Sequence, residues 1–168
     1  MRLAVTGTPG TGKTTATDRV ETDLDVVHLN ELIRREGLYT EVDEDRESVV
    51  ADLDAVATRL EGLDDIIVDS HLSHYLEVED VVVLRCEPGE LERRLRRRGA
   101  SAAKAAENAE SEALDVILSE AVQGHGEDHV YEVDTTDRSP EEVAEEIERI
   151  LQGDVRPSAG TVDFTGYL

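Results

Sequence analysis

The stretch GTPGTGKTT, residues 7–15, follows a short apolar run, Leu3–Thr6, near the start of the chain. It fits the pattern G-x-x-x-x-G-K-[ST] in full, between an expected strand and an expected helix. The glycines let backbone N–H groups curl around a polyphosphate, and the following helix directs its positive end at the anion. In this pattern Lys13 supplies a point charge for the β- and γ-phosphates, and the Thr14 hydroxyl binds Mg²⁺. The stretch therefore predicts a site for a nucleoside triphosphate.

Apolar runs of strand length alternate with helical patterns along the chain, which predicts a parallel sheet covered by helices on both faces. We expect a P-loop α/β fold, a three-layer sandwich with a five-stranded parallel sheet in the order 2-3-1-4-5. The predicted strands are Leu3–Thr6, Val26–Leu29, Ile66–Asp69, Val81–Arg85 and Val130–Val133.

Two helices have clear boundary signals. Pro88 is expected at the start of one, and Gly99 is expected to end it. Ser139 is expected to cap the other, with Pro140 at its first position and Glu142 closing a capping box.

Acidic residues outnumber basic ones by 40 to 17, which gives a formal net charge of −23. Regular apolar periodicity argues against disorder, and the carboxylates are spread along the chain rather than gathered in an acidic tail. Two of the basic residues are lysines, Lys13 and Lys104, and the rest are arginines. We interpret the composition as adaptation to molar salt, which screens the self-repulsion of a carboxylate-rich surface.

The cysteine content, the length of the apolar runs and the net charge also indicate where the protein is located and what it binds. A single cysteine, Cys86, precludes an internal disulfide and is interpreted as a small buried apolar residue. No apolar run approaches the ~20 residues that span a bilayer, and no signal peptide is evident. We therefore expect a cytoplasmic protein without membrane contact. The strongly negative charge also argues against direct nucleic-acid binding.

The predicted strand Ile66–Asp69 is apolar except for the aspartate at its end. Such a strand lies beside the phosphate-loop strand in this fold, so its terminal Asp69 is expected near the Mg²⁺. Aspartate also commonly begins a turn, which is the alternative interpretation. His71, two residues further on, is expected to orient a water or contact a phosphate, with a purely structural role as the alternative interpretation. The histidines at 74, 125 and 129 are interpreted as structural.

An ordered set of motifs resembles the atypical adenylate kinases, which are related to the coilin-interacting nuclear ATPase protein and its archaeal counterparts. The resemblance covers about residues 1–152 and points to a halophilic archaeal branch. It is carried by GTPGTGKTT (7–15), LIRREGLY (32–39), DEDR (43–46), VDSH (68–71), VLRCEPGELERRLRRRG (83–99) and ENAESEALDVILSEA (107–121).

The resemblance implies roles for particular residues. Arg34 matches an arginine that faces the acceptor nucleotide, in a nucleoside-monophosphate segment at 30–52. Arg98 matches the arginine that opens a short lid at 98–108 and contacts ATP. Asp69 and His71 match the family's Asp-x-His pair. The positions matching its ATP-phosphate loop are Gly10, Gly12, Lys13, Thr14 and Thr15.

The arginine run at 93–98 has two interpretations. Its members either pair with carboxylates on a solvated helix face, or contact phosphate or RNA. We expect phosphate contact from Arg98 and a surface position for the others. The tail at 153–168 is interpreted as a loosely packed extension, with docking through Phe164 and Tyr167 as the alternative.

Together these features predict a nucleoside-monophosphate-kinase-like domain at residues 1–152 that transfers the γ-phosphoryl group of ATP to AMP with Mg²⁺. The resemblance also implies ATPase activity and a role in small ribosomal subunit assembly and rRNA maturation, through a basic platform protein. A nucleotide-dependent binding switch and a kinase for another small molecule remain alternatives. Dependence on AMP distinguishes these possibilities.

Overall fold

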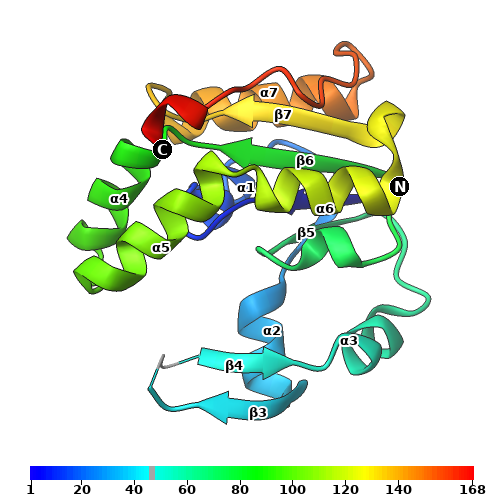
Figure 1. Cartoon of the computed structure of the whole chain (residues 1–168). Coiled ribbons are helices and arrows are strands. Elements are labelled where there is room, and N and C mark those ends of the chain that lie inside the picture. Colours follow the sequence, from blue (N-terminus) through cyan, green and yellow to red (C-terminus); the bar gives the residue numbers. More distant parts are fainter. Residues whose placement is uncertain (46–47) are drawn as a thin grey trace.

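Five parallel strands form the central sheet of the computed structural model, which describes residues 1–45 and 48–168 (Figure 1). The sheet order is β2-β5-β1-β6-β7, which is 2-3-1-4-5 when these strands are counted alone, as predicted. Each predicted strand agrees with the observed one to within one residue at either end. The bounds are β1 Arg2–Thr6, β2 Asp25–His28, β5 Ile66–Asp69, β6 Asp80–Arg85 and β7 Val130–Asp134.

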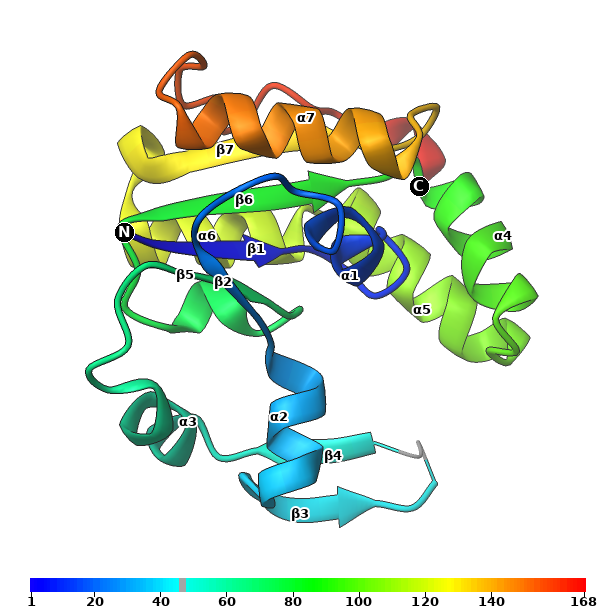
Figure 2. The same cartoon turned by 180° about the vertical axis from the view of Figure 1, so that it is seen from behind.

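Helices cover both faces of this sheet (Figures 1 and 2). Side chains alternate along β1, so Leu3 and Val5 face α1 (Lys13–Thr17) and α7 (Pro140–Leu151). Ala4 faces α6 (Val116–His125) on the opposite side. Strands buried on both faces have continuous apolar sequences, which is why the strands of this sheet were recognisable.

An arm beside β2 carries α2 (Leu29–Glu36), a hairpin of β3 (Tyr39–Asp43) and β4 (Ser48–Ala51), and α3 (Leu53–Leu60). It stands apart from the central sheet in Figure 1. Apolar residues of α2 and α3 pack on Ile66 and Val68 of β5, which anchors the arm. The predicted monophosphate segment, 30–52, corresponds to most of this arm. Its residues 46 and 47, which include the end of the quoted DEDR, lie outside the described residues.

A second projection is the helix pair α4 (Pro88–Arg97) and α5 (Ala102–Ala113). The Glu87 side chain caps α4, and Ser101 caps α5. Ala105 of α5 packs with Cys86, Leu91 and Leu95, so the small residues of this stretch permit close helix contact. The predicted lid, 98–108, therefore corresponds to the turn between two helices and the first half of α5.

The two predicted helix ends are confirmed. Gly99 follows α4 with a positive φ of 92°, in the left-handed region that suits glycine. Ser139 caps α7 by accepting the Glu142 N–H, and Pro140 is the first helical residue. The short 3₁₀ helices are η1 (Ser73–Tyr75), η2 (Glu127–His129) and η3 (Thr165–Tyr167).

The C-terminal tail is docked onto the domain. Glu132 of β7 accepts the backbone N–H groups of Gly160 and Val162. The Phe164 ring lies 5.4 Å from the Arg85 guanidinium, and the Tyr167 hydroxyl donates to Glu92 of α4. The interpretation as a loosely packed extension is therefore wrong, because specific contacts hold the tail from end to end. Within residues 1–45 and 48–168, no helix has the length and apolarity needed to cross a membrane.

Candidate functional site

The phosphate loop connects β1 to α1 at the carboxyl edge of the sheet. Gly7 has φ 149°, and a Cβ there would lie 2.6 Å from the Leu84 carbonyl oxygen. A Cβ on Gly10, which has φ 94°, would lie 2.9 Å from the Leu91 side chain. Both positions therefore require glycine, because the loop turns tightly against β6 and α4. Helix α1 has only five residues, so its dipole is small. The N–H groups of the loop therefore contribute more to anion binding than the helix dipole does.

Buried side chains from distant segments hold the loop in place. The Thr8 hydroxyl donates to Glu112 of α5 over 3.0 Å. On the other side, the Thr135 hydroxyl after β7 lies 3.3 Å from the Thr11 carbonyl oxygen and 3.2 Å from an Arg94 nitrogen. The loop is thus tied both to the end of the sheet and to the α4–α5 projection.

Lys13 lies within the loop that it completes. Its ammonium donates to the carbonyl oxygens of Gly7, at 2.7 Å, and Thr8, at 3.2 Å. Burial lowers the pKa of Lys13 to about 8; the charges of Asp69 and Glu112 oppose this shift without cancelling it, and the charge of Arg98 adds to it. The carboxylates near Lys13 therefore compensate only part of the cost of burying its charge. A phosphate anion would supply the missing counter-charge.

Asp69 ends β5 beside the phosphate-loop strand, where it pairs in register with Val5 of β1. Its side chain is nearly buried, and its Oδ2 accepts from the Thr17 hydroxyl at 2.5 Å and from His28 Nδ1 at 2.7 Å. The other ring nitrogen of His28 contacts Asp18 Oδ1 at 2.8 Å. Burial lowers the pKa of the His28 imidazole, but its hydrogen bonds to Asp69 and Asp18 outweigh burial and raise the pKa overall.

His71 lies two residues beyond Asp69. Burial lowers its pKa to about 4, assisted by the charges of Lys13 and His74. The imidazole is therefore neutral near pH 7 and can exchange hydrogen bonds without adding charge to the site. His74 is buried between the Thr6 hydroxyl and Glu120, as expected for a structural histidine.

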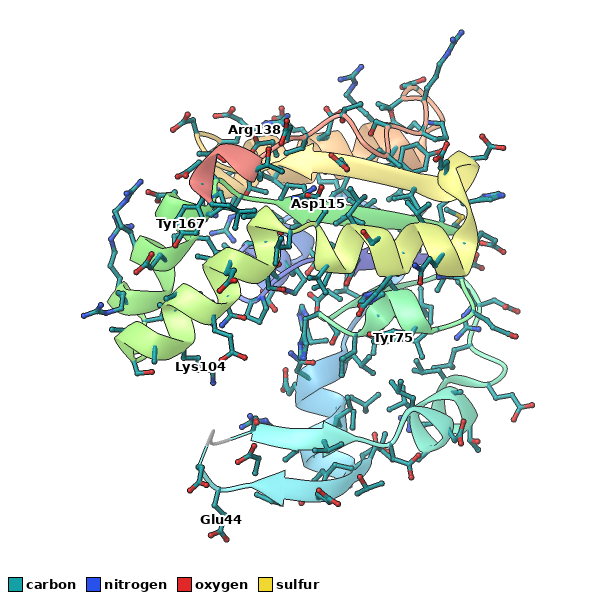
Figure 3. The ribbon with its side chains drawn as sticks, viewed as in Figure 1. Glu44, Tyr75, Lys104, Asp115, Arg138 and Tyr167 are labelled. Atoms are coloured by element: carbon teal, nitrogen blue, oxygen red, sulfur yellow. The ribbon has the colours of Figure 1, made fainter. Side chains whose placement is uncertain are left out.

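A single cavity of about 1320 Å³ gathers most of the predicted residues. The arm lines one wall with Asn30, Arg34 and Ser48, and α4 and α5 line another. Figure 3 shows Lys104 projecting from α5 on the side where the hairpin lies. Asp69 is not part of the lining and lies behind it at the end of β5. The predicted residues on the cavity wall are Gly10, Gly12, Lys13, Thr14, Thr15, Arg34, His71 and Arg98.

The cavity wall is strongly cationic, unlike the chain as a whole. Seven of the 17 lysines and arginines line it, including both lysines. Among the residues that the structure describes, Glu120 is the one carboxylate in the lining. The seven cations are Lys13, Arg34, Arg94, Arg97, Arg98, Lys104 and Arg138. Such a wall attracts an extended polyanion.

The arginine run was interpreted as surface apart from Arg98, and this is wrong for Arg94; Arg97 is exposed as expected but also lines the cavity. Arg94 is partly buried and donates to the carbonyl oxygen of Thr135 at 2.9 Å, and Arg97 lines the cavity. Both residues lie on the side of α4 nearer the loop. The sequence alone did not show which arginines face the loop, because a run of consecutive arginines places the same residue type on every face of the helix.

The donor set near Lys13 fits Mg²⁺. Thr14 presents an exposed hydroxyl at the cavity, and Asp69 adds a carboxylate behind it. Mg²⁺ prefers oxygen ligands and is usually held by one or two protein groups together with substrate phosphates and waters. Thr14 and Asp69 would hold the ion, and the ion would neutralise charge on the phosphate oxygens.

Sequence reasoning missed His28, Glu112, Arg94 and Lys104. The end of β2 was predicted, and the expected strand order already placed it beside Asp69, so that order was a usable signal for His28. Glu112 gave no comparable signal, because its partner Thr8 lies 104 residues away in the sequence.

Comparisons with known proteins agree with this architecture. A family model described as an AAA domain matches residues 3–115. A "Putative adenylate kinase" from Natronomonas pharaonis is 62% identical over 168 residues, covering both chains completely. The protein of that name from Halobacterium salinarum is 62% identical over 169 residues and also covers both chains completely. Both organisms are halophilic archaea. In the relative from Methanothermobacter thermautotrophicus the identity is 46%, over 99% of this chain and 98% of that one.

Solved structures show the same fold at low identity. Shikimate kinase from Bacteroides thetaiotaomicron superposes with a TM-score of 0.59 and 18% identity, covering 90% of this chain and 98% of that chain. Shikimate kinase from Aquifex aeolicus gives a TM-score of 0.54 and 16% identity, covering 92% and 98%. The phosphate loop, the 2-3-1-4-5 sheet and the archaeal relatives agree, and the chain belongs to the P-loop family whose archaeal members carry the name "Putative adenylate kinase".

Proposed function

We propose that the protein is a nucleoside-monophosphate kinase that transfers the γ-phosphoryl group of ATP to AMP and yields two ADP. One observation carries the proposal: seven cations line a single large cavity in a chain of net charge −23. A volume of about 1320 Å³ exceeds the roughly 300–1,000 Å³ of ordinary ligand pockets, and two nucleotides require such room. The names of the archaeal relatives support the same reaction.

The site residues then divide between donor and acceptor. Lys13 and the loop N–H groups bind the β- and γ-phosphates of ATP, with Gly10, Gly12 and Thr15 shaping the loop. Thr14 and Asp69 hold Mg²⁺, which supplies charge neutralisation. Arg34 on the arm binds the acceptor phosphate, and Arg98 contacts ATP from the opposite wall. His71, being neutral, orients a phosphate or a water by hydrogen bonding.

Phosphoryl transfer needs positioning and charge stabilisation more than covalent chemistry. The cavity walls suit this need, since Arg34 and Arg98 lie on separate projections that contribute to one cavity. We propose that the arm segment 30–52 and the lid 98–108 close over bound nucleotides within a kinase domain spanning residues 1–152. Closure excludes water, so the γ-phosphoryl group goes to AMP rather than being lost by hydrolysis.

A second candidate is an ATPase that acts in small ribosomal subunit assembly and rRNA maturation by binding a basic platform protein. The observation that favours it is the distribution of charge. With seven of the 17 cations committed to the cavity, the remaining surface is dominated by carboxylates and suits a basic partner. In this function the arm and lid close over ATP without an acceptor nucleotide.

Nucleotide turnover in molar KCl with Mg²⁺-ATP, measured with and without AMP, tests the proposal. ADP must be resolved from inorganic phosphate, and Lys13→Ala serves as the blank. We expect ADP to appear only with AMP and without matching phosphate. Phosphate release that is independent of AMP would replace the kinase with the ATPase.

A further inference from the structure

His28 lies between two carboxylates at the carboxyl edge of the sheet. Its Nδ1 is 2.7 Å from Asp69 Oδ2, and its Nε2 is 2.8 Å from Asp18 Oδ1. Parallel pairing of β2 with β5 places His28 in register with Asp69, so the backbone itself fixes the first contact. Asp18 follows α1, so the imidazole connects the end of β2 to the segment after the phosphate loop.

Both hydrogen-bond donors to Asp69 meet the same carboxylate oxygen. The Thr17 hydroxyl and His28 Nδ1 both lie on Oδ2, at 2.5 and 2.7 Å. Among residues 1–45 and 48–168, Oδ1 has no hydrogen-bond partner. A carboxylate held by two donors on one oxygen cannot rotate freely, which leaves the other oxygen in a defined direction.

We infer that His28 is a positioning residue that holds the Asp69 carboxylate so that Oδ1 is available to Mg²⁺ bound with nucleotide, and that Asp18 orients the His28 ring for this purpose. The inference rests on the proposed use of Mg²⁺-ATP. Groups that orient a metal ligand through a hydrogen bond commonly change metal affinity by 10–100-fold when they are removed.

Two amide substitutions separate the two ends of the imidazole. In His28→Asn, the side-chain amide nitrogen replaces Nδ1 and retains the donor to Asp69. In His28→Gln, the amide nitrogen replaces Nε2 and retains the contact to Asp18. If His28 positions Asp69, the Mg²⁺ effect on ATP binding should survive in His28→Asn and be lost in His28→Gln. This order is the opposite of what side-chain size alone predicts, because glutamine is the larger and more nearly isosteric replacement.

The measurement is the affinity for ATP by equilibrium binding in molar KCl, once with Mg²⁺ and once with EDTA. The increase in ATP affinity caused by Mg²⁺ can be measured without turnover, so it reports on Asp69 independently of the kinase reaction. We expect this tightening to stay within about 2-fold of wild type in His28→Asn and to fall by about 10-fold or more in His28→Gln. Affinity in EDTA should be unchanged in both variants.

Controls separate positioning from folding. His129→Gln removes an exposed histidine that contacts Asp80, away from the cavity, and should leave the Mg²⁺ effect unchanged. Thr17→Val removes the other donor to Oδ2 and should reduce the Mg²⁺ effect even if His28→Gln fails to fold. Thermal melts identify a variant that is merely unfolded.

Equal loss of the Mg²⁺ effect in His28→Asn and His28→Gln would overturn the inference, as would an unchanged effect in both. Absence of any Mg²⁺ effect in the wild type would overturn the inference and the Mg²⁺ site together. A normal Mg²⁺ effect with the expected asparagine–glutamine difference, in a protein that transfers nothing to AMP, would overturn the kinase and leave the inference standing.

Discussion

Glu112→Leu should destabilise the protein severely, because Glu112 is the buried centre of an ion network. Its carboxylate accepts from Arg85 Nε at 3.2 Å, from the Cys86 N–H at 2.8 Å and from the Thr8 hydroxyl at 3.0 Å. Arg85 is 1% exposed, and its remaining carboxylate partners are Asp115, at 2.6 Å, and Glu132, at 3.6 Å.

Removing one partner of a buried ion pair costs about 3–5 kcal/mol when the other charge is left unpaired, and the low end applies here because Arg85 keeps Asp115 and Glu132. Two further donors, at Thr8 and Cys86, lose their acceptor, and each such loss costs about 1 kcal/mol or more. We therefore expect Glu112→Leu to lower the free energy of unfolding by roughly 4–6 kcal/mol. That is a large share of the ~5–15 kcal/mol typical of a domain.

Urea unfolding in molar KCl, followed by far-ultraviolet circular dichroism, measures this loss; the chain has no tryptophan for fluorescence. Glu110→Leu is the matched control, an exposed position on the same helix, expected to change stability by less than about 0.5 kcal/mol. A loss below about 1 kcal/mol for Glu112→Leu would refute the reasoning.

Three further predictions concern pH, salt and the tail. Burial, partly offset by Glu120, lowers the pKa of His74, so the folded state binds fewer protons than the unfolded state and stability falls as pH drops below about 6.5. His74→Asn should flatten the decline in the free energy of unfolding between pH 6.5 and 5, by at most about 1.4 kcal/mol per pH unit, as measured by urea unfolding. An unchanged slope would contradict this. Burial raises the pKa of the Cys86 thiol to about 11, so the thiol should resist a thiol reagent at pH 8 in molar KCl. It should react after transfer to dilute buffer, where we expect the protein to unfold. Equal reaction rates in the two buffers would count against salt-dependent folding. Phe164→Ala should cost about 1 kcal/mol and speed proteolysis of the tail, because the ring covers the buried Arg85; proteolysis at the wild-type rate would mean that the tail is held by other contacts.

The central sheet was predictable because its signals are local. Each strand is a short apolar run, and the phosphate loop fixes the position of the first strand. Helix boundaries at Pro88 and Ser139 follow from chemistry within four residues of each end. Strand order then follows from the small number of ways in which such a fold is connected.

Other parts were not predictable for physical reasons. The hairpin of Tyr39–Asp43 and Ser48–Ala51 exposes much of both strands, including Val42 and Val50, so it lacks the apolar continuity of a buried strand. Helix α5 buries Ala105, Ala109 and Ala113, whose small side chains give a weak apolar pattern in spite of the regular spacing. The contacts of Glu112 and His28 depend on which elements become neighbours in the folded chain.

The cationic cavity and the acidic surface are two parts of one electrostatic arrangement. In dilute solution a net charge of −23 repels a nucleotide well before contact. At 1 M salt the screening length is about 3 Å, so distant carboxylates no longer oppose an incoming phosphate, whereas cations at contact distance still act on it. Lys13, Arg34 and Arg98 line the cavity itself, and salt screens the partly buried Lys13 least. The salt that permits a carboxylate-rich fold therefore also lets the cavity attract nucleotides according to its own charge.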